Sequence, residues 1–375
     1  MRSSRHNLDV ATQLAEPEQP DDWRWQLRHA LRTADALRVS LDLTDDEYAG
    51  ALRAEHAGFP ILVTPYMLGL CSRADPACPI RRQIVPHALE SREVAGDLRD
   101  PLGEEAHEVA PDLVRRYPDR ALLLVSDLCA VYCRFCTRSR MVGRGRGPRP
   151  VRDLESALQY LRRHPEIREV IVSGGDPLVM TTERLDEILL AVRAISSIEI
   201  VRLATRVPSV LPQRVTPELT SMLRRHQPVW VMSHFNHPAE VTPRAGQALE
   251  ALADAGLPVM NQTVLLRDVN DRADVLERLF RALVRRRVRP YYLLQADPVR
   301  GTGHLRTPLQ RGVALMRALQ GSVSGIALPK LIVDTPGGMG KVPVGPDFVV
   351  ERAPGRTRLV THRSVEVDYL DPPES

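Results

Sequence analysis

The chain has 375 residues, which is enough for one large α/β domain or two smaller domains. Its 51 basic and 47 acidic residues give a net charge of +4, and so even a balance argues against a nucleic-acid-binding protein. No segment approaches the ~20 consecutive apolar residues of a membrane-spanning helix, so we expect no membrane insertion.

The N-terminal region, residues 1–110, is expected to be mostly helical. Residues 1–22 are polar and lack the apolar core of a signal peptide, which favours a cytoplasmic protein. Asp21 or Asp22 can cap a helical stretch that extends over residues 22–55, in which Trp23 and Leu27 belong to a loose apolar stripe.

From residue 121 onward, short apolar runs alternate with helical patterns, which indicates βαβ units and a parallel sheet. The expected strands lie at 121–125, 169–173, 198–204, 229–233, 258–266, 289–295 and 330–334. The expected helices between them lie at 152–163, 182–195, 217–225, 243–255, 271–286 and 308–320. The predicted fold is therefore α/β, a partial (β/α)6-type barrel over residues 111–345, followed by a short C-terminal arm at 346–375.

Three of the five cysteines, Cys129, Cys133 and Cys136, follow the first predicted strand in a CxxxCxxC run. Thiolates of this kind hold iron–sulfur clusters. Three ligands on a [4Fe–4S] cluster leave one iron open, and radical S-adenosylmethionine (SAM) enzymes use that iron to chelate SAM; Phe135 fits their CxxxCxΦC form. A zinc knuckle is the alternative, but structural zinc takes four closed ligands, and Cys71 and Cys78 lie far away in the sequence.

Lysine is rare in this chain: of the 51 basic residues, only Lys330 and Lys341 are lysines. A lysine amine can form a Schiff base, which an arginine guanidinium cannot. Lys341 ends the glycine-rich stretch DTPGGMGK, where a phosphate-gripping loop or a plain turn is the alternative. The stretch is not a Walker A motif, because Val342 follows the lysine. The arginines at 115–120 could bind a cofactor phosphate.

Polar residues follow several of the predicted strands. SGGDP follows the second strand, HFNHP the fourth, and Gln295, Asp297 and Asp334 lie at the ends of the last two. The carboxyl ends of parallel strands meet at one mouth, so we expect these groups to converge there. Paired glycines let the backbone approach a ligand, and Asp176 could receive an ammonium group; ordinary strand-end caps are the alternative.

The sequence closely resembles the lysine 2,3-aminomutase family of radical SAM enzymes that depend on pyridoxal phosphate (PLP). The resemblance covers most of residues 22–345 in order, through WRWQL, TPY, PIRRQ, RYPDR, the cysteine loop with Thr137 and Arg138, SGGDPL, HFNHP, Gln262, QADPVRGTGH and DTPGGMGK.

The resemblance implies a site of four parts. Cys129, Cys133 and Cys136 would hold the [4Fe–4S] cluster, and Lys341 would bind PLP, seated by Arg116, Tyr117 and Arg120. SAM would contact Ser173, Gly174, Gly175, Asp176, His234 and Gln262. The substrate carboxylate would pair with Arg138, and its cationic end would meet Asp297 and Asp334, two carboxylates with no lysine or arginine expected between them.

The activity implied is an intramolecular amino migration that converts L-lysine to β-lysine. Arginine is the rival substrate because a guanidinium also pairs with carboxylates, whereas a glutamate side chain would be disfavoured by two anions. The short relatives that modify elongation factor P are a further possibility, although TPYMLGL and PIRRQ favour the free-lysine enzymes. A PLP-free radical SAM enzyme acting on RNA or peptide and a non-catalytic iron–sulfur protein are the other classes.

The family also implies partners. We expect an amino acid substrate, an external electron donor of flavodoxin or ferredoxin type, no nucleic acid, and a homodimer or higher homo-oligomer. Larger family members carry a zinc site built from cysteines after the fifth strand and in the C-terminal arm. No cysteine follows Cys136 here, which argues against zinc.

Overall fold

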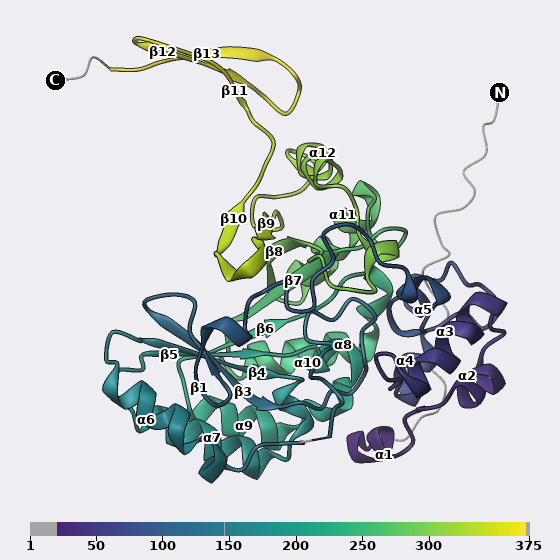
Figure 1. Cartoon of the computed structure of the whole chain (residues 1–375). Coiled ribbons are helices and arrows are strands. Elements are labelled where there is room, and N and C mark those ends of the chain that lie inside the picture. Colours follow the sequence, from purple (N-terminus) through teal and green to yellow (C-terminus); the bar gives the residue numbers. More distant parts are fainter. Residues whose placement is uncertain (1–20, 146, 373–375) are drawn as a thin grey trace.

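The computed structural model describes residues 21–145 and 147–372. Its centre is a ten-stranded sheet in which the strands lie side by side in chain order, and the curved sheet encloses the middle of the molecule (Figure 1). Seven neighbouring strands run parallel: β3 (Arg120–Ser126), β4 (Glu169–Gly174), β5 (Ile200–Ala204), β6 (Val229–Ser233), β7 (Val259–Leu265), β8 (Val288–Gln295) and β9 (Lys330–Asp334).

The edges of this sheet are antiparallel. β1 (Glu108–Ala110) and β2 (Leu113–Val114) extend it beyond β3, and β10 (Lys341–Pro343) extends it beyond β9. In the described part of the chain the two edge strands do not pair with each other, so the barrel stays open. The α/β class and the partial barrel are thus confirmed, and the seven parallel strands β3–β9 correspond to the seven predicted strands.

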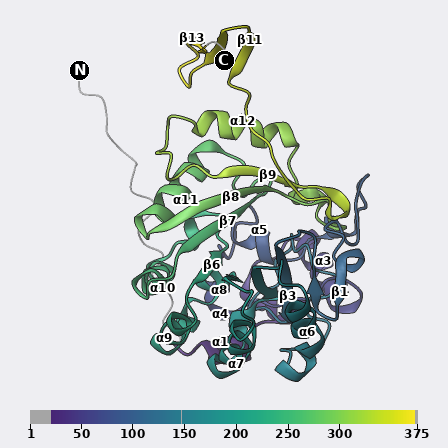
Figure 2. The ribbon, with the colours of Figure 1, turned by 90° about the vertical axis from the view of Figure 1, so that its left-hand side faces the viewer.

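The outer face of the parallel strands is covered by amphipathic helices, and Figure 2 shows them arranged around the curved sheet. Thr181, Thr216 and Thr242 cap three of them by accepting hydrogen bonds from backbone N–H groups of the first turn. The helices are α6 (Glu155–Arg163), α7 (Thr182–Arg193), α8 (Val207–Val210), α9 (Pro217–Arg225), α10 (Pro243–Asp254), α11 (Ala273–Arg285) and α12 (Leu309–Leu319).

Each of the longer helices buries one apolar face against the sheet. In α11, Val275, Leu276, Leu279, Phe280 and Leu283 are buried at helical spacing. Short 3-10 turns shape the connections: η3 (Val151–Leu154), η4 (Pro177–Val179), η5 (Pro212–Arg214), η6 (Pro238–Glu240), η7 (Gly303–Leu305) and η8 (Pro336–Gly338).

The N-terminal region is helical as predicted, but residues 22–55 form three helices rather than one stretch. Asp22 caps the first helix as expected, and the new caps Thr33 and Thr44 begin the next two. Thr44 and Glu47 form a capping box, which fixes a helix start in the middle of the predicted span. The helices are α1 (Trp23–Arg28), α2 (Ala34–Ser40), α3 (Asp45–His56), α4 (Pro65–Gly69) and α5 (Arg81–Ile84), followed by the turns η1 (Ala88–Ser91) and η2 (Glu105–His107).

Of the polar N-terminal segment 1–22, only Asp21 and Asp22 lie within the described residues. Within the described residues, no helix is long and apolar enough to cross a membrane.

The C-terminal arm forms a separate antiparallel sheet that projects from the barrel beyond β10 (Figure 1). Its strands are β11 (Val349–Ala353), β12 (Arg356–Val360) and β13 (Glu366–Leu370). The sequence analysis predicted only a short arm here, and the structure shows that it folds into these three strands. Tyr369 and Leu370 on this last strand are exposed.

Candidate active site

The predicted site residues converge on one cavity of about 680 Å³ inside the open barrel. Groups from strand ends, the cysteine loop and the β10 lysine all contribute to its lining. Of the predicted site residues only Asp334 is absent from the lining, and it lies directly behind, bonded to Lys341 and Arg116. The cavity has the size and the mixed lining of a typical small-molecule site.

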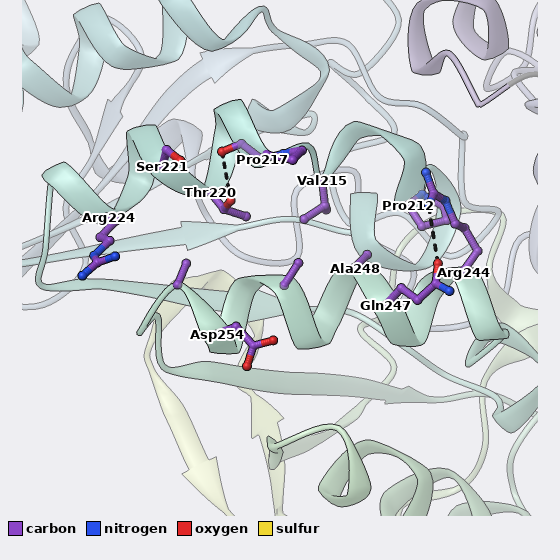
Figure 3. Close-up of a pocket in the computed structure, with 12 residues that line it drawn as sticks. Pro212, Val215, Pro217, Thr220, Ser221, Arg224, Arg244, Gln247, Ala248 and Asp254 are labelled. Carbon is purple, nitrogen blue, oxygen red and sulfur yellow. Dashed lines mark hydrogen bonds between the residues drawn. The ribbon is translucent and has the colours of Figure 1, made fainter.

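A second cavity of about 460 Å³ lies between α9 and α10, on the outer side of the barrel (Figure 3). None of the predicted site residues lines it. Two of its polar side chains already have partners, since Arg244 pairs with Asp21 and Thr220 donates to the Pro217 carbonyl. We therefore place the active site in the barrel cavity.

The cysteine loop leaves β3 and presents all three thiols to the barrel cavity. Burial raises the pKa of the Cys136 thiol to about 12 and raises that of Cys129 well above its ordinary value, with neighbouring sulfurs adding to both shifts. Such thiols stay protonated until a metal displaces the proton, as expected for ligands rather than free nucleophiles.

The donor set fits an iron–sulfur cluster better than a single ion. Among the described residues, no group of three or more His, Cys, Asp or Glu side chains is placed to hold one metal ion. In a cubane cluster each thiolate binds a different iron, so the three sulfurs need not meet at a point.

The paired glycines after β4 have a packing role in addition to lining the cavity. A Cβ on Gly174 would lie 2.1 Å from the Ser126 carbonyl oxygen, and one on Gly175 would lie 2.2 Å from that of Leu128. Gly174 also has a φ of +128°, which favours glycine. Only glycine therefore lets this turn press against the cysteine loop.

Asp176 corrects one sequence expectation. Although it lines the cavity, its carboxylate accepts hydrogen bonds from the Thr205 hydroxyl and from the backbone N–H groups of Leu178, Arg206 and Val207. Burial raises its pKa to about 6, against the effect of these hydrogen bonds. Its acceptor positions are already used to join the loops after β4 and β5, so it is not free to receive an ammonium group.

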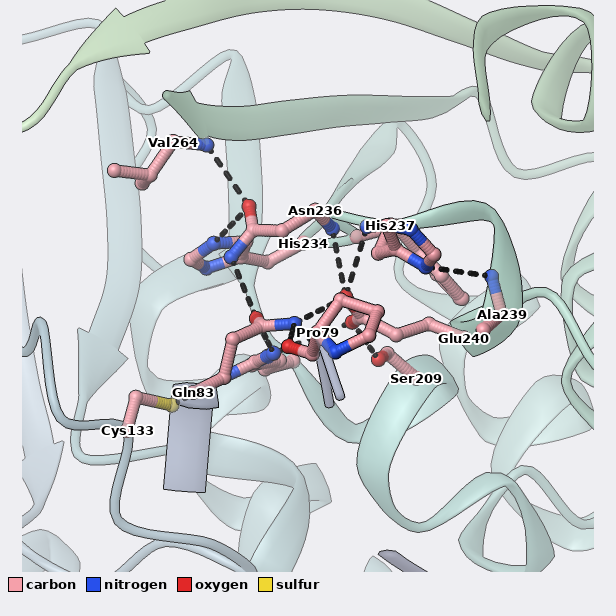
Figure 4. Close-up of polar contacts among 12 residues, drawn as sticks. Pro79, Gln83, Cys133, Ser209, His234, Asn236, His237, Ala239, Glu240 and Val264 are labelled. Atoms are coloured by element: carbon pink, nitrogen blue, oxygen red, sulfur yellow. Dashed lines mark hydrogen bonds and ion pairs between the residues drawn. The ribbon is translucent and has the colours of Figure 1, made fainter. Parts of the chain in front are cut away.

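His234, which follows β6, is held neutral. Burial and then the nearby Arg206 cation lower its pKa to about 3. Its Nε2 lies 3.0 Å from the Asn236 side-chain oxygen (Figure 4). Its ring meets the Phe135 ring edge-on. Gln262 projects into the same cavity from β7.

Arg138 was predicted to be open to a substrate carboxylate, but it already holds one from this chain. Its Nε lies 2.9 Å from Glu104 Oε1 and its Nη2 lies 2.7 Å from the same oxygen. Its Nη1 donates to the Ser173 hydroxyl and the Gly174 carbonyl. Glu104 therefore fills the Nε–Nη2 edge of the guanidinium, and Nη1 already has two acceptors, so a second carboxylate that binds through Nη1 and Nη2 must replace one of the Nη1 contacts.

Glu104 is buried, with 4% of its surface exposed. Burial acts to raise its pKa, but Arg138 and then Arg140 outweigh that effect and hold the pKa below its ordinary value. The carboxylate therefore stays ionised between the two guanidinium groups.

The glycine-rich stretch before Lys341 forms the hairpin between β9 and β10, which sets Lys341 directly opposite Asp334. The Lys341 ammonium pairs with the Asp334 carboxylate, and Arg116 Nη2 donates to the same carboxylate at 3.3 Å. The expectation that no lysine or arginine would lie beside Asp334 is thus wrong. Arg116 lies 218 residues from Asp334 in the sequence, whereas Lys341 lies only 7 residues from it and meets it across the β9–β10 hairpin.

Tyr117 and Arg120 lie on the β3 side of this lysine. The Tyr117 hydroxyl accepts a hydrogen bond from the Lys341 backbone N–H at 2.9 Å. The Arg120 guanidinium stacks over the Tyr117 ring at 3.7 Å from its centroid. Arg116 and Arg120 thus place two cations near the Lys341 amine, with the Tyr117 ring between Arg120 and the lysine backbone.

Asp297, after β8, faces the cavity. Within the described residues it has no salt-bridge partner, but nearby charges shift its pKa. Burial and the Asp334 charge raise its pKa to about 7, while Lys341 and Arg116 pull it the other way. The pair of carboxylates therefore creates a place where a further cation is favoured.

Sequence reasoning missed two residues of this site, Glu104 and Arg206. Arg206 lies two residues after β5, so the strand-end rule applied to the third parallel strand would have found it. Glu104 lies in the connecting segment before β1, and nothing in its local pattern indicates the cavity.

Comparisons with known proteins agree with this geometry. Residues 123–279 match the family model "Radical SAM superfamily", and residues 316–375 match the model "Lysine-2,3-aminomutase". An L-lysine 2,3-aminomutase from Fusobacterium nucleatum is 43% identical over 355 residues, which cover 95% of this chain and 83% of that protein.

Two further relatives show the range of the family. The L-lysine 2,3-aminomutase of Clostridium subterminale is 43% identical, with 94% of this chain and 84% of that protein covered. A glutamate 2,3-aminomutase of Clostridioides difficile is 36% identical over 94% of this chain and 84% of its own length. The barrel and its cysteine loop are thus those of a radical SAM enzyme. Within that superfamily the chain belongs to the lysine 2,3-aminomutase family, whose members are isomerases that move an amino group.

Proposed function

We propose that this chain is an L-lysine 2,3-aminomutase that converts L-lysine to β-lysine. The observation that carries the proposal is that Lys341 and the three cysteines line one cavity, together with Asp297. The 43% identity to L-lysine 2,3-aminomutases supports the choice of substrate.

Within this proposal each cofactor has its own residues. Cys129, Cys133 and Cys136 hold a [4Fe–4S] cluster, while Ser173, Gly174, Gly175, His234 and Gln262 surround SAM. Lys341 binds PLP with Arg116, Tyr117 and Arg120. When bound, these groups supply a carbon-centred radical and an imine across which nitrogen can migrate, and the protein contributes orientation and exclusion of water.

The charges along the cavity give the substrate a direction. Arg138 pairs with the α-carboxylate through Nη2 and Nη1, and the carboxylate replaces Ser173 or Gly174 as an acceptor at Nη1. An amine of Lys341 that is committed to PLP no longer neutralises Asp334, which then faces the substrate together with Asp297. A distal ammonium fills the place that the lysine ammonium leaves.

Arginine is the second candidate substrate, because its guanidinium can pair with the same two carboxylates. Glutamate is disfavoured, since its side-chain carboxylate would be a third anion beside Asp297 and Asp334, and Arg116, which stays beside Asp334 when Lys341 holds PLP, carries a single positive charge. The family relationship alone does not decide between these substrates, because the family includes a glutamate 2,3-aminomutase.

The test is an anaerobic incubation of the iron-reconstituted protein with SAM, PLP, dithionite and separate amino acids, with β-isomers identified by chromatography. We expect β-lysine as the main product, and no product from a Cys136→Ala variant. β-Arginine as the main product would replace the proposed substrate. SAM cleavage that needs neither PLP nor Lys341 would point to a PLP-free radical SAM enzyme, and an absence of SAM cleavage would point to a non-catalytic iron–sulfur protein.

We also propose that a flavodoxin- or ferredoxin-type protein delivers the electron, that the chain acts in the cytoplasm, and that it forms a homodimer or higher homo-oligomer. We further propose three units, residues 1–110, 111–345 and 346–375. The separate sheet of the last unit supports this division.

A further inference from the structure

Arg206 contacts one of the three cysteines of the loop, and its place there is fixed from two sides. Its Nη1 donates a hydrogen bond to the Cys133 sulfur. Its backbone N–H donates to the Asp176 carboxylate at 2.7 Å, and its guanidinium lies 5.2 Å from the centroid of the Phe135 ring. Both the main chain and the charged group of Arg206 are therefore held against the cysteine loop.

The other end of the guanidinium is bound to a buried polar network, which Figure 4 shows. Arg206 Nη2 donates to Gln83 Oε1 at 2.6 Å and to Glu240 Oε2 at 3.2 Å. Glu240 is completely buried and also accepts from the Ser209 hydroxyl and the Gln83 amide. Asn236 donates to Gln83 in turn. Arg206 Nε is buried without a hydrogen-bond partner among the described residues, so the cation is held in place by its Nη1, its Nη2 and its backbone N–H.

The network has an apolar surrounding. Phe135, Leu266, Val269, Ala296 and Leu305 form a buried cluster against which Cys133 packs. In such a setting a hydrogen bond to a sulfur ligand and a nearby charge act strongly on an iron–sulfur centre, because little water screens them.

We propose that Arg206 is a positioning residue that tunes the cluster held by Cys129, Cys133 and Cys136, by donating a hydrogen bond to the Cys133 thiolate and placing a buried cation beside it. The inference rests on the proposed function, since it requires the cluster. Hydrogen bonds to cluster sulfurs and local charge set the reduction potential of such centres. Arg206 stabilises the more negative, reduced state, and Glu240 moderates this effect by compensating the cation.

The step affected is the reduction of the cluster. The core passes from the 2+ to the 1+ level by accepting one electron from a flavodoxin- or ferredoxin-class donor, and dithionite is the donor in the test. No proton moves, and Arg206 remains a cation throughout, so its effect is electrostatic.

The test is a redox titration of the reconstituted full chain without SAM, followed by electron paramagnetic resonance. In Arg206→Gln we expect the ratio of reduced to oxidised cluster at a fixed ambient potential to fall about tenfold, the usual scale for such outer-shell contacts. This corresponds to a midpoint about 59 mV more negative for a one-electron couple. Arg206→Lys keeps the charge and should shift less.

The Glu240→Gln variant should shift the midpoint potential in the opposite direction. It leaves the Arg206 cation uncompensated, so the midpoint should become less negative, which a mere loss of packing would not produce. Arg82→Met is the matched control: it removes a cation from the same helix as Gln83, but one that pairs with the exposed Asp268, and its midpoint should match the parent.

The outcomes distinguish a failure of the proposed function from a failure of the role proposed for Arg206. A parent protein that binds no cluster would contradict the proposed function. An intact cluster with an unchanged midpoint in both Arg206 variants would overturn the role of Arg206. Weaker SAM binding at an unchanged midpoint would also overturn it and assign Arg206 to SAM. If Arg206→Gln loses iron, the midpoint potentials of Arg206→Lys and Glu240→Gln decide. If neither midpoint differs from that of the parent, the proposal is refuted.

Discussion

The Glu104 carboxylate fills one edge of the Arg138 guanidinium, with an Oε1–Nη2 distance of 2.7 Å. Glu104 comes from the segment before β1, and Arg138 from the cysteine loop. The same segment contacts the lysine hairpin, because the Pro101 carbonyl accepts a hydrogen bond from the Gly337 N–H. It also contacts Arg116, which donates a hydrogen bond to the Leu102 carbonyl. The segment 101–104 therefore connects the proposed carboxylate site at Arg138 to the proposed PLP site at Lys341.

This contact predicts how Glu104 affects substrate binding. If Glu104 orients Arg138, then Glu104→Gln should raise KM for lysine about tenfold with a smaller change in kcat, since a charge-assisted pair contributes about 1.5–3 kcal/mol. The control is Glu105→Gln, whose side chain is largely exposed and should matter little. A lower KM in Glu104→Gln would instead show that Glu104 competes with the substrate for Arg138.

Asp297 predicts a pH dependence. Because burial and Asp334 raise its pKa to about 7, its carboxyl group is neutral below that pH and charged above it. KM for lysine should therefore fall as the pH rises through about 7. In Asp297→Asn this dependence should disappear and KM should rise about ten- to a hundredfold, the loss of one charge-assisted hydrogen bond. A pH dependence that persists in Asp297→Asn would contradict the assignment.

The same group affects stability with the opposite trend. Its ordinary pKa is 3.8, so between about pH 4 and about pH 7 the folded protein retains a proton that the unfolded chain has lost. Unfolding free energy should therefore decrease as the pH rises through this window. At pH 8 the cofactor-free Asp297→Asn variant should be about 4 kcal/mol more stable than the parent, and at pH 4 the two should be alike, as measured by urea denaturation.

Lys341 is expected to be the site of PLP attachment. After incubation with PLP, borohydride should fix about one phosphopyridoxyl group per chain, located by peptide mapping at Lys341. Lys330 is exposed at the start of β9, at the end of the strand away from the cavity, so Lys330→Arg should label like the parent. Labelling that survives in Lys341→Arg would contradict the proposal.

The buried pair Arg81–Glu47 is predicted to hold the N-terminal helices together. Arg81 donates to both Glu47 oxygens and to the carbonyls of Asp42 and Arg73, and its side chain is fully buried. Arg81→Met leaves the Glu47 charge buried and unpaired, so the unfolding free energy should fall by about 3–5 kcal/mol.

The control for Arg81→Met is Arg73→Met, which breaks the exposed pair with Asp42 and should cost no more than about 1 kcal/mol. Adding Glu47→Leu to Arg81→Met should recover much of the loss in urea denaturation. Equal costs for the two single variants would show that burial of the Arg81 pair is not decisive.

The sequence by itself determined the alternation of strands and helices and the position of the cysteine loop. It also indicated which chain positions meet at one cavity, because parallel strands bring their carboxyl ends to the same edge and local hydrophobic patterns mark those ends. For this reason Cys133, His234 and Asp297 could be placed before the fold was known, whereas Lys341 was indicated by the rarity of lysine and by the family resemblance; all four line the cavity.

Only the tertiary structure decided the partners of these groups. Glu104 and Arg138 lie 34 residues apart, and Gln83 and Arg206 lie 123 apart, so no local pattern relates them. Asp176 looked available because two of its backbone donors, Arg206 and Val207, belong to the loop after the next strand. The Arg116 partner of Asp334 lies 218 residues away in the sequence. A carboxylate's charge state and availability depend on which groups the packing brings within hydrogen-bonding distance, and that packing is set by the whole core.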